Sequence, residues 1–196
     1  MTSSLPTTAP TLAYDDSGSG PPVVLLHPSG FGPALLGPFA QRLAHQRRVV
    51  VPHRRGFGGS ATSTPPAGIE DLCDDLAEVV DALGLERPVV VGVSAGATLA
   101  LAFAVRHPGR AGAVVAHEPL IGPLGGSLHP RIVSRIGRLL DRADEPRETS
   151  LFMAELVGRR AWNSLPNAWR ENVERHGAAT RREAGIFGAF ALDEDE

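Results

Sequence analysis

The chain has 196 residues, a formal net charge of −3 and a single cysteine, Cys73. This is the length of one domain with a substantial core, and the charge gives no reason to expect nucleic acid or an anionic membrane as partner. One cysteine excludes an internal disulfide and a multi-cysteine metal site, and it favours a reducing compartment. All 19 basic residues are arginine, which excludes chemistry that needs a lysine, such as Schiff-base formation.

The N-terminal residues MTSSLPTTAPTL lack the basic start and the apolar run of a secretory signal. No stretch of about eighteen apolar residues, the length that crosses a bilayer as a helix, occurs in the chain. The sequence therefore predicts a cytoplasmic protein without a membrane span.

The first half of the chain alternates apolar runs with loops and helical patterns. Residues 22–27 (PVVLLH) form an apolar run that ends in the loop-like segment PSGFGP, which is typical of a buried strand. Residues 33–45 carry leucine and phenylalanine near helical spacing, and a second apolar run at 49–52 precedes the loop HRRGFGGS. The pattern predicts strand, helix and strand.

Residues 69–83 give the clearest helix, with an apolar face and six acidic residues mostly on the other face, and Gly84 is a natural stop. A strand at 88–93, an alanine-rich helix at 95–107 and a strand at 112–117 are expected next. Because continuous apolar strands alternate with helices, the predicted fold class is α/β, with a mostly parallel, doubly wound sheet.

The strand pattern ends after Pro119. Residues 130–145 alternate arginine with isoleucine, valine and leucine at helical spacing, and two further helical segments are expected after them. This region is short for an independent core, so a helical cap over one end of the sheet is favoured over a separate domain. The predicted division is a core at 12–120, a helical cap region at 121–192 and a solvated acidic tail at 193–196.

Gly92-Val93-Ser94-Ala95-Gly96 stands between the strand at 88–93 and the helix at 95–107. A nucleophile exposed at the top of a strand needs a tight, strained turn, in which side chains two residues away on either side would collide. Gly92 and Gly96 remove those side chains. The helix start directs amides such as that of Ala95 towards charge beside the Ser94 hydroxyl. The turn therefore suits acyl transfer, although the motif alone also fits a purely structural turn.

From about Leu12 to its end, the chain resembles the α/β-hydrolase superfamily, specifically its capped serine hydrolases, on the segments LLHPSGFG, HRRGFGGS and GVSAG. The resemblance implies that Ser94 is the nucleophile. It also implies an oxyanion hole made by the amide of Ala95 and one amide from the loop 27–32. Pro28 has no N–H, so Ser29 is the preferred second donor and Gly30 the alternative. The residues predicted to line the pocket are His27, Phe31 and Val93.

The second loop departs from the family pattern, because His53 stands where an aspartate is common. A loop-stabilising role is favoured for His53 over a catalytic one.

The family order of Ser, then Asp or Glu, then His requires later strands that the sequence does not display. Glu118 is a candidate acid and His117 a candidate base at the end of the strand 112–117. Adjacent strand residues point to opposite faces, so the favoured interpretation is that both shape the pocket. His107, His129 and His176 are interpreted as capping or surface residues.

The chain thus looks like a hydrolase that stops just after its cap, with the C-terminal strands missing. The strand 112–117 would then be an open edge, through which a second copy or a complementing chain could pair.

The sequence predicts a serine hydrolase that uses no cofactor and no metal and acts on a small apolar ester, thioester, lactone or similar substrate through a Ser94 acyl-enzyme. A serine at the turn points away from haloalkane and epoxide chemistry. The alternative is a catalytically impaired remnant that acts as a binding module or needs a complementing chain. A nucleotide-binding sheet is disfavoured, because Ser94 stands where a dinucleotide fingerprint needs its second glycine.

Overall fold

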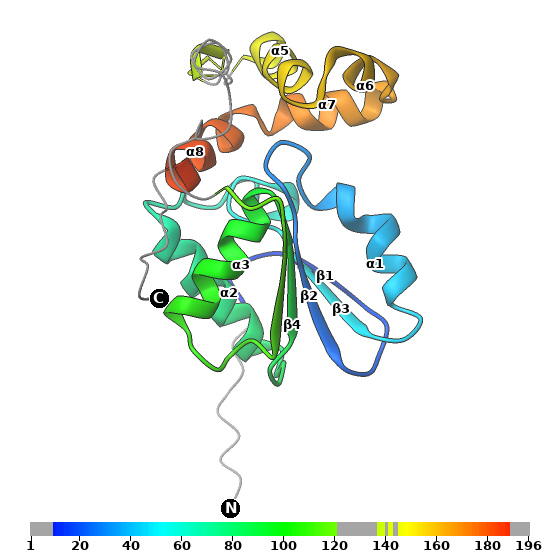
Figure 1. The fold of residues 1–196 in the computed structure, drawn as a ribbon, viewed down its shortest axis with the longest axis vertical. Helices are drawn as coiled ribbons and strands as arrows, with labels where there is room; N and C mark the ends of the chain where they lie inside the picture. Colours follow the sequence, from blue (N-terminus) through cyan, green and yellow to red (C-terminus); the bar gives the residue numbers. More distant parts are fainter. Residues whose placement is uncertain (1–9, 121–136, 140, 143–144, 189–196) are drawn as a thin grey trace, which may run out of the picture.

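The structure, a computed structural model, describes residues 10–120, 137–139, 141–142 and 145–188. Its centre is a five-stranded sheet in the order β1-β3-β2-β4-β5 (Figure 1). Strands β2, β3, β4 and β5 are parallel, and β1 runs antiparallel to β3. The strands are β1 (Tyr14–Ser17), β2 (Pro22–Leu26), β3 (Arg48–Pro52), β4 (Val89–Val93) and β5 (Ala113–His117). The predicted α/β class with a mostly parallel sheet is confirmed.

Alternation along the strands divides the core between the two faces of the sheet. Val23 and Leu25 of β2 pack towards α1 (Gly37–Leu43), which follows the short 3-10 helix η1 (Pro33–Leu36). Val24 and Leu26 point the other way, towards α2 (Ile69–Ala82) and α3 (Ala95–Arg106). Helices therefore cover both faces, which explains why these strands are apolar throughout.

The predicted elements before residue 120 occur within one or two residues of their expected bounds, except that the helix expected at 33–45 is divided into η1 and α1. Strand β1 is missed, because three of its four residues are exposed and YDDS carries no apolar alternation. Helix α2 departs from its predicted polar face at Asp75. This carboxylate is buried and accepts two hydrogen bonds from Arg55, at 2.6 and 2.7 Å, in the loop after β3.

The described helices after residue 145 are α5 (Pro146–Val157), α6 (Arg159–Ser164), α7 (Asn167–Arg175) and α8 (Gly177–Gly188), and they are called the cap below. The expectation of two helical segments there is wrong, because breaks at Gly158, Pro166 and Gly177 give four. Gly158 has φ of 90°, outside the helical range. Most of the helix expected at 130–145 lies outside the described residues, although 137–139 are helical.

The cap lies over the carboxyl ends of the parallel strands (Figure 1). Phe152, Met153, Trp162 and Val173 form its own small apolar cluster, against which Phe31 of the core packs. Phe187 of α8 is fully buried in the main core. The cap and the sheet therefore share apolar surface.

Strand β5 is the last strand of the described sheet, and Val115 on it is 52% exposed. Pairing of this edge with a second copy or another chain stays a prediction. Within the described part of the chain, every helix is too short or too polar to cross a membrane.

Candidate active site

Ser94 occupies a strained turn between β4 and α3. Its φ of 52° and ψ of −120° lie outside the regions that non-glycine residues ordinarily adopt. The Ser94 amide donates to the carbonyl of His117 at 2.9 Å, so β5 holds the turn from the side. The residue is partly exposed, and its hydroxyl has no hydrogen-bond partner among the described residues. The turn thus presents an alcohol to which none of the described residues is hydrogen-bonded.

The two glycines of the turn are required by close backbone contacts. A Cβ on Gly92 would lie 2.1 Å from the carbonyl oxygen of Gly96, and a Cβ on Gly96 would lie 2.2 Å from that of Leu26. Neither glycine has a positive φ, so the constraint is space and not backbone conformation. The first turn of α3 therefore lies directly against the end of β2.

This close approach brings two sets of backbone amides to the same end of the sheet. Ala95 is the first residue of α3, and its amide has no acceptor among the described residues, as expected at a helix start. The amides of Ser29 and Gly30, in the loop after β2, are likewise not bonded to any described residue. These are the donors predicted for an oxyanion hole.

The His27 side chain supports the loop 27–32 from inside. Its Nδ1 lies 2.9 Å from the Pro28 carbonyl and its Nε2 lies 3.3 Å from the Arg54 amide, which fits a neutral ring protonated on Nδ1. Burial, and secondarily the Arg54 charge, holds the pKa of His27 well below its ordinary value. His27 is 0% exposed, and its place in the pocket lining stays a prediction.

A buried ion pair joins this loop region to the cap. Arg54, in the loop after β3, donates to both carboxylate oxygens of Glu183 on α8, with Nε at 2.6 Å and Nη2 at 3.0 Å. Each residue is 1% exposed. Arg54 Nη1 also donates to the His27 carbonyl, and the Ser29 hydroxyl donates to Glu183 Oε2. Nothing in the sequence pattern predicted this pair.

Residues 21–171 match the family model of the alpha/beta hydrolase fold. The chain belongs to the alpha/beta hydrolase fold family. Its match covers all four parallel strands, the strained serine turn and most of the cap.

Individual family members resemble the chain at moderate identity. A 2-hydroxy-6-oxo-2,4-heptadienoate hydrolase from Pseudomonas putida is 40% identical over 118 residues, which are 57% of this chain and 41% of that protein. An alpha/beta hydrolase from Sphaerobacter thermophilus has a TM-score of 0.70 at 28% identity, over 92% of this chain and 71% of that one. A thermophilic esterase from Thermogutta terrifontis has a TM-score of 0.66 at 28% identity, over 91% and 65%. The chain spans about two-fifths of the length of the curated relatives it matches.

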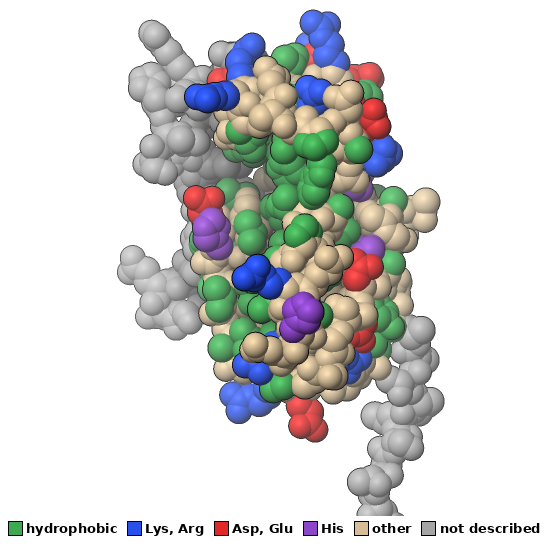
Figure 2. All heavy atoms as spheres, turned by 90° about the vertical axis from the view of Figure 1, so that its right-hand side faces the viewer, with side chains coloured by type: hydrophobic (Ala, Val, Ile, Leu, Met, Phe, Trp, Pro, Cys, Tyr) green, Lys and Arg blue, Asp and Glu red, His purple; other side chains and the backbone are tan. Residues whose placement is uncertain are grey.

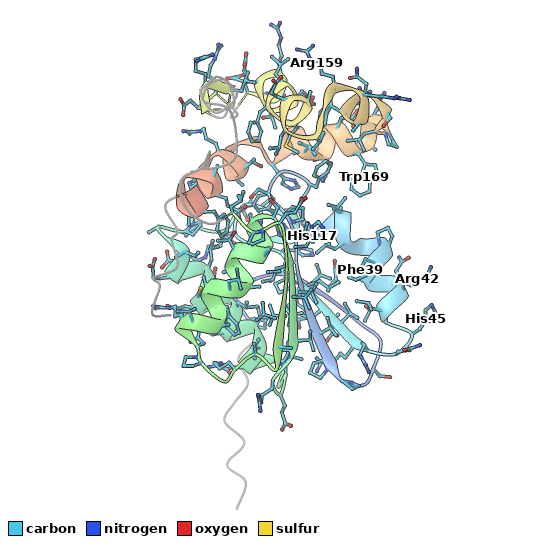
Figure 3. All side chains as sticks on the ribbon, in the orientation of Figure 1. Phe39, Arg42, His45, His117, Arg159 and Trp169 are labelled. Atoms are coloured by element: carbon cyan, nitrogen blue, oxygen red, sulfur yellow. The ribbon has the colours of Figure 1, made fainter. Side chains whose placement is uncertain are left out.

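His117 and Glu118 lie close to the hydrolase turn but do not contact its serine through a side-chain hydrogen bond. Both are exposed, and Glu118 has a positive φ of 52°. Figure 3 places His117 at the upper end of the strands, below the cap. Leu120, just beyond, is fixed to α3 by two hydrogen bonds between its backbone and the Thr98 hydroxyl, at 2.8 and 2.9 Å. The roles of His117 and Glu118 as base and acid stay predictions.

His53, His107 and His176 have partners among the described residues. His53 accepts from the Gly59 amide at 3.0 Å and lies 3.1 Å from Asp15, so the predicted loop-stabilising role is confirmed. His107, at the end of α3, has its Nε2 3.1 Å from the carboxylate of the exposed Asp74 on α2. His176 is the C-cap residue of α7, as the capping alternative predicted, but it is only 7% exposed, so the surface alternative is wrong. His129 lies outside the described residues.

The buried position of His176 lies between α7 and α8 of the hydrolase cap. Its ring centroid is 5.0 Å from that of Phe57, and its Nε2 accepts from the Gly58 amide at 3.3 Å. Burial lowers the pKa of His176, and a contact with the Gly30 carbonyl partly opposes this effect. No alternating pattern marks such a residue, because the short helix α7 is polar on most of its surface.

Phe31 and Val93, predicted to line the pocket, are both partly buried. The Phe31 ring lies 6.4 Å from that of Trp169, whose side chain points from α7 towards the core (Figure 3). Hydrophobic side chains gather between the cap and the sheet on the face that Figure 2 shows. Within the described residues, no group of three or more histidine, cysteine or acidic side chains could hold a metal ion.

Proposed function

We propose that the protein is a serine hydrolase in which Ser94 attacks the carbonyl carbon of a small ester, thioester, lactone or similar acyl substrate. The observation that carries the proposal is the conformation of Ser94, which has a φ of 52° at the end of β4. None of the described residues forms a hydrogen bond with its hydroxyl. Strain of this kind costs on the order of 1–3 kcal/mol and persists where the surroundings enforce it. Here Gly92 and Gly96 supply the space.

In the proposed reaction, Ser94 Oγ forms a bond to the acyl carbon and loses its proton to a base. The carbonyl oxygen gains negative charge, which the amides of Ala95 and Ser29, or Gly30 in place of Ser29, would stabilise. Collapse of this intermediate breaks the bond to the leaving group, which takes up a proton, and leaves an acyl-enzyme. Water then attacks the acyl carbon and releases the acid and Ser94.

The proposed reaction needs a base that takes the Ser94 proton. No described histidine side chain is hydrogen-bonded to the Ser94 hydroxyl, and His117 and Glu118, at the end of β5, are the candidates for base and acid. In serine hydrolases that lack part of the triad, the oxyanion hole and substrate binding alone can keep the reaction roughly 10³–10⁴-fold faster than in water. Weak turnover therefore does not require a complete triad.

The substrate class rests on the chemistry of a serine nucleophile and on the surroundings of the turn. Phe31 of the loop 27–32 packs against the ring of Trp169 and against the apolar cluster of the cap, so apolar and aromatic surface lies at this loop. Such surface favours a small apolar acyl group. The similarity to an esterase at 28% identity supports the same class.

The test is hydrolysis of a short-chain nitrophenyl ester together with labelling by a fluorophosphonate probe. We expect the Ser94→Ala variant to lose both labelling and ester hydrolysis. The control is Ser164→Ala, which removes an exposed hydroxyl bonded only within its own helix. Equal labelling of the wild type and Ser94→Ala would reject the proposed nucleophile.

The second candidate is a catalytically impaired protein that acts as a binding module or needs a complementing chain. The observation that favours it is the absence of a described base on the Ser94 hydroxyl. In this case the purified protein would release no nitrophenol in a Ser94-dependent way, although the fold and the turn would be intact by circular dichroism.

A further inference from the structure

A hydrogen bond joins the Ser29 side chain to the cap. The Ser29 hydroxyl donates to Oε2 of Glu183, which comes from α8, 154 residues further along the chain. Ser29 is only partly buried, so its hydroxyl could bond to water instead. A contact with a buried carboxylate is stronger than one with water and fixes the direction of the side chain.

The Glu183 carboxylate is itself held on two sides. Its two oxygens receive Nε and Nη2 of Arg54 in a bidentate pair. The central carbon of the Arg54 guanidinium lies over the rings of Phe57 and Phe187, 5.4 and 6.0 Å from their centroids. The carboxylate therefore has a fixed position relative to the ends of β2 and β3.

Two more cap residues hold the same loop. Asn172 of α7 donates its side-chain amide to the Phe31 carbonyl at 2.8 Å. The His176 ring lies against Gly32, so that a Cβ there would be 3.2 Å from the ring. Several cap residues thus hold the loop 29–32. Of their hydrogen bonds named above, the one to Glu183 is the one that joins the cap to Ser29, whose amide is the preferred second oxyanion donor.

We propose that Glu183 is a positioning residue: through the Ser29 hydroxyl it fixes the loop 29–32 so that its amides face the Ser94 oxygen. The proposal rests on the proposed function for its catalytic consequence. If Glu183 has this role, the oxyanion hole is complete only when α8 is packed against the core. A purely structural ion pair between Arg54 and Glu183 would be satisfied without Ser29.

Four variants separate positioning from stability. Ser29→Ala removes the contact but leaves the Arg54–Glu183 pair and every backbone amide in place. Ser29→Thr keeps a hydroxyl and is the conservative rescue. Glu183→Gln weakens the pair as well, so it serves as the second variant. Ser150→Ala is the matched control, because the Ser150 hydroxyl donates to the Glu174 carboxylate within the cap, away from the loop.

The first measurement is amide hydrogen exchange of the peptide that contains residues 27–32, which needs no activity. We expect Ser29→Ala to raise its exchange by about tenfold to a hundredfold, the equivalent of one lost charge-assisted hydrogen bond. Glu183→Gln should raise it as well, whereas Ser29→Thr and Ser150→Ala should leave it at the wild-type rate. Unchanged exchange in Ser29→Ala would overturn the proposal.

The second measurement is ester hydrolysis. Misplacement of a donor reduces the chemical step, so kcat should fall about tenfold or more in Ser29→Ala while KM stays within about twofold. Faster exchange with an unchanged kcat would overturn the positioning role. If the wild type itself shows no Ser94-dependent turnover, the proposed function fails, and the exchange comparison still decides whether Glu183 holds the loop.

Discussion

Gly92 and Gly96 face each other across the Ser94 turn so closely that a Cβ on Gly92 would lie 2.1 Å from the Gly96 carbonyl oxygen. The atoms in conflict are backbone atoms at the start of α3, which cannot rotate away as a side chain could. We expect Gly92→Ala to destabilise the protein by about 2 kcal/mol or more, because overpacking of this kind typically costs about 1–3 kcal/mol. Urea denaturation of the wild type and the variant measures the loss.

Gly185→Ala is the matched control, and its expected effect on the free energy of unfolding is opposite in sign to that of Gly92→Ala. It is exposed in α8, and a Cβ there would meet nothing within 4 Å. Glycine in a helix interior is less stable than alanine by roughly 0.5–1 kcal/mol, so Gly185→Ala should stabilise the protein by about that amount. Destabilisation by both substitutions to a similar extent would contradict the steric account of the turn.

The Arg54–Glu183 pair is predicted to be costly to break and inexpensive to replace. Arg54→Met and Glu183→Met, made singly, each leave a buried charge without its partner. We expect each to lower the free energy of unfolding by about 3–5 kcal/mol. The double variant Arg54→Met with Glu183→Met removes both charges and should recover most of that loss. Guanidinium denaturation of the four proteins gives the coupling energy. Additive losses would show that the two side chains are not energetically paired.

The core and the serine turn were predictable because their signals are local. The strand at 89–93 is apolar, and the helix that follows is rich in alanine. The spacing of Gly92, Ser94 and Gly96 predicts that a Cβ at either glycine would collide with backbone, and the contacts in the structure agree. Each of these signals is contained in a window of fewer than twenty residues. The parallel sheet then follows from the alternation of strands and helices.

The contacts that join cap and core were not predictable, because their partners are far apart in the sequence. Arg54 and Glu183 are 129 residues apart, and each alone reads as a surface charge. His176 was expected to be a capping or surface residue, and its burial was missed for the same reason: its helix is polar, and Phe57 and Gly32, which lie against its ring, come from distant loops. Burial of a polar residue by tertiary contacts leaves no periodic pattern behind.

Two buried histidines predict that the protein loses stability in mild acid. The pKa values of His27 and His176 are both lowered from the ordinary value of 6.5, chiefly because burial disfavours the charged ring. In the unfolded chain both return to about 6.5. Below that pH the unfolded state therefore binds more protons than the folded state. The free energy of unfolding is consequently highest above about pH 6.5, as far as these two histidines determine it, and falls as the pH is lowered.

The expected slope is up to about 1.4 kcal/mol per pH unit for each histidine that stays neutral in the folded state. Guanidinium denaturation at several pH values between about 5 and 7.5 measures it, above the range in which ordinary carboxylates titrate. His176→Gln keeps an acceptor for the Gly58 amide but cannot take up a proton, so its slope should be smaller than that of the wild type. The exposed His45 provides the control, because His45→Gln should leave the slope unchanged. A free energy of unfolding that stays constant or rises from pH 7 to about 5 would contradict the neutral, buried state of these rings.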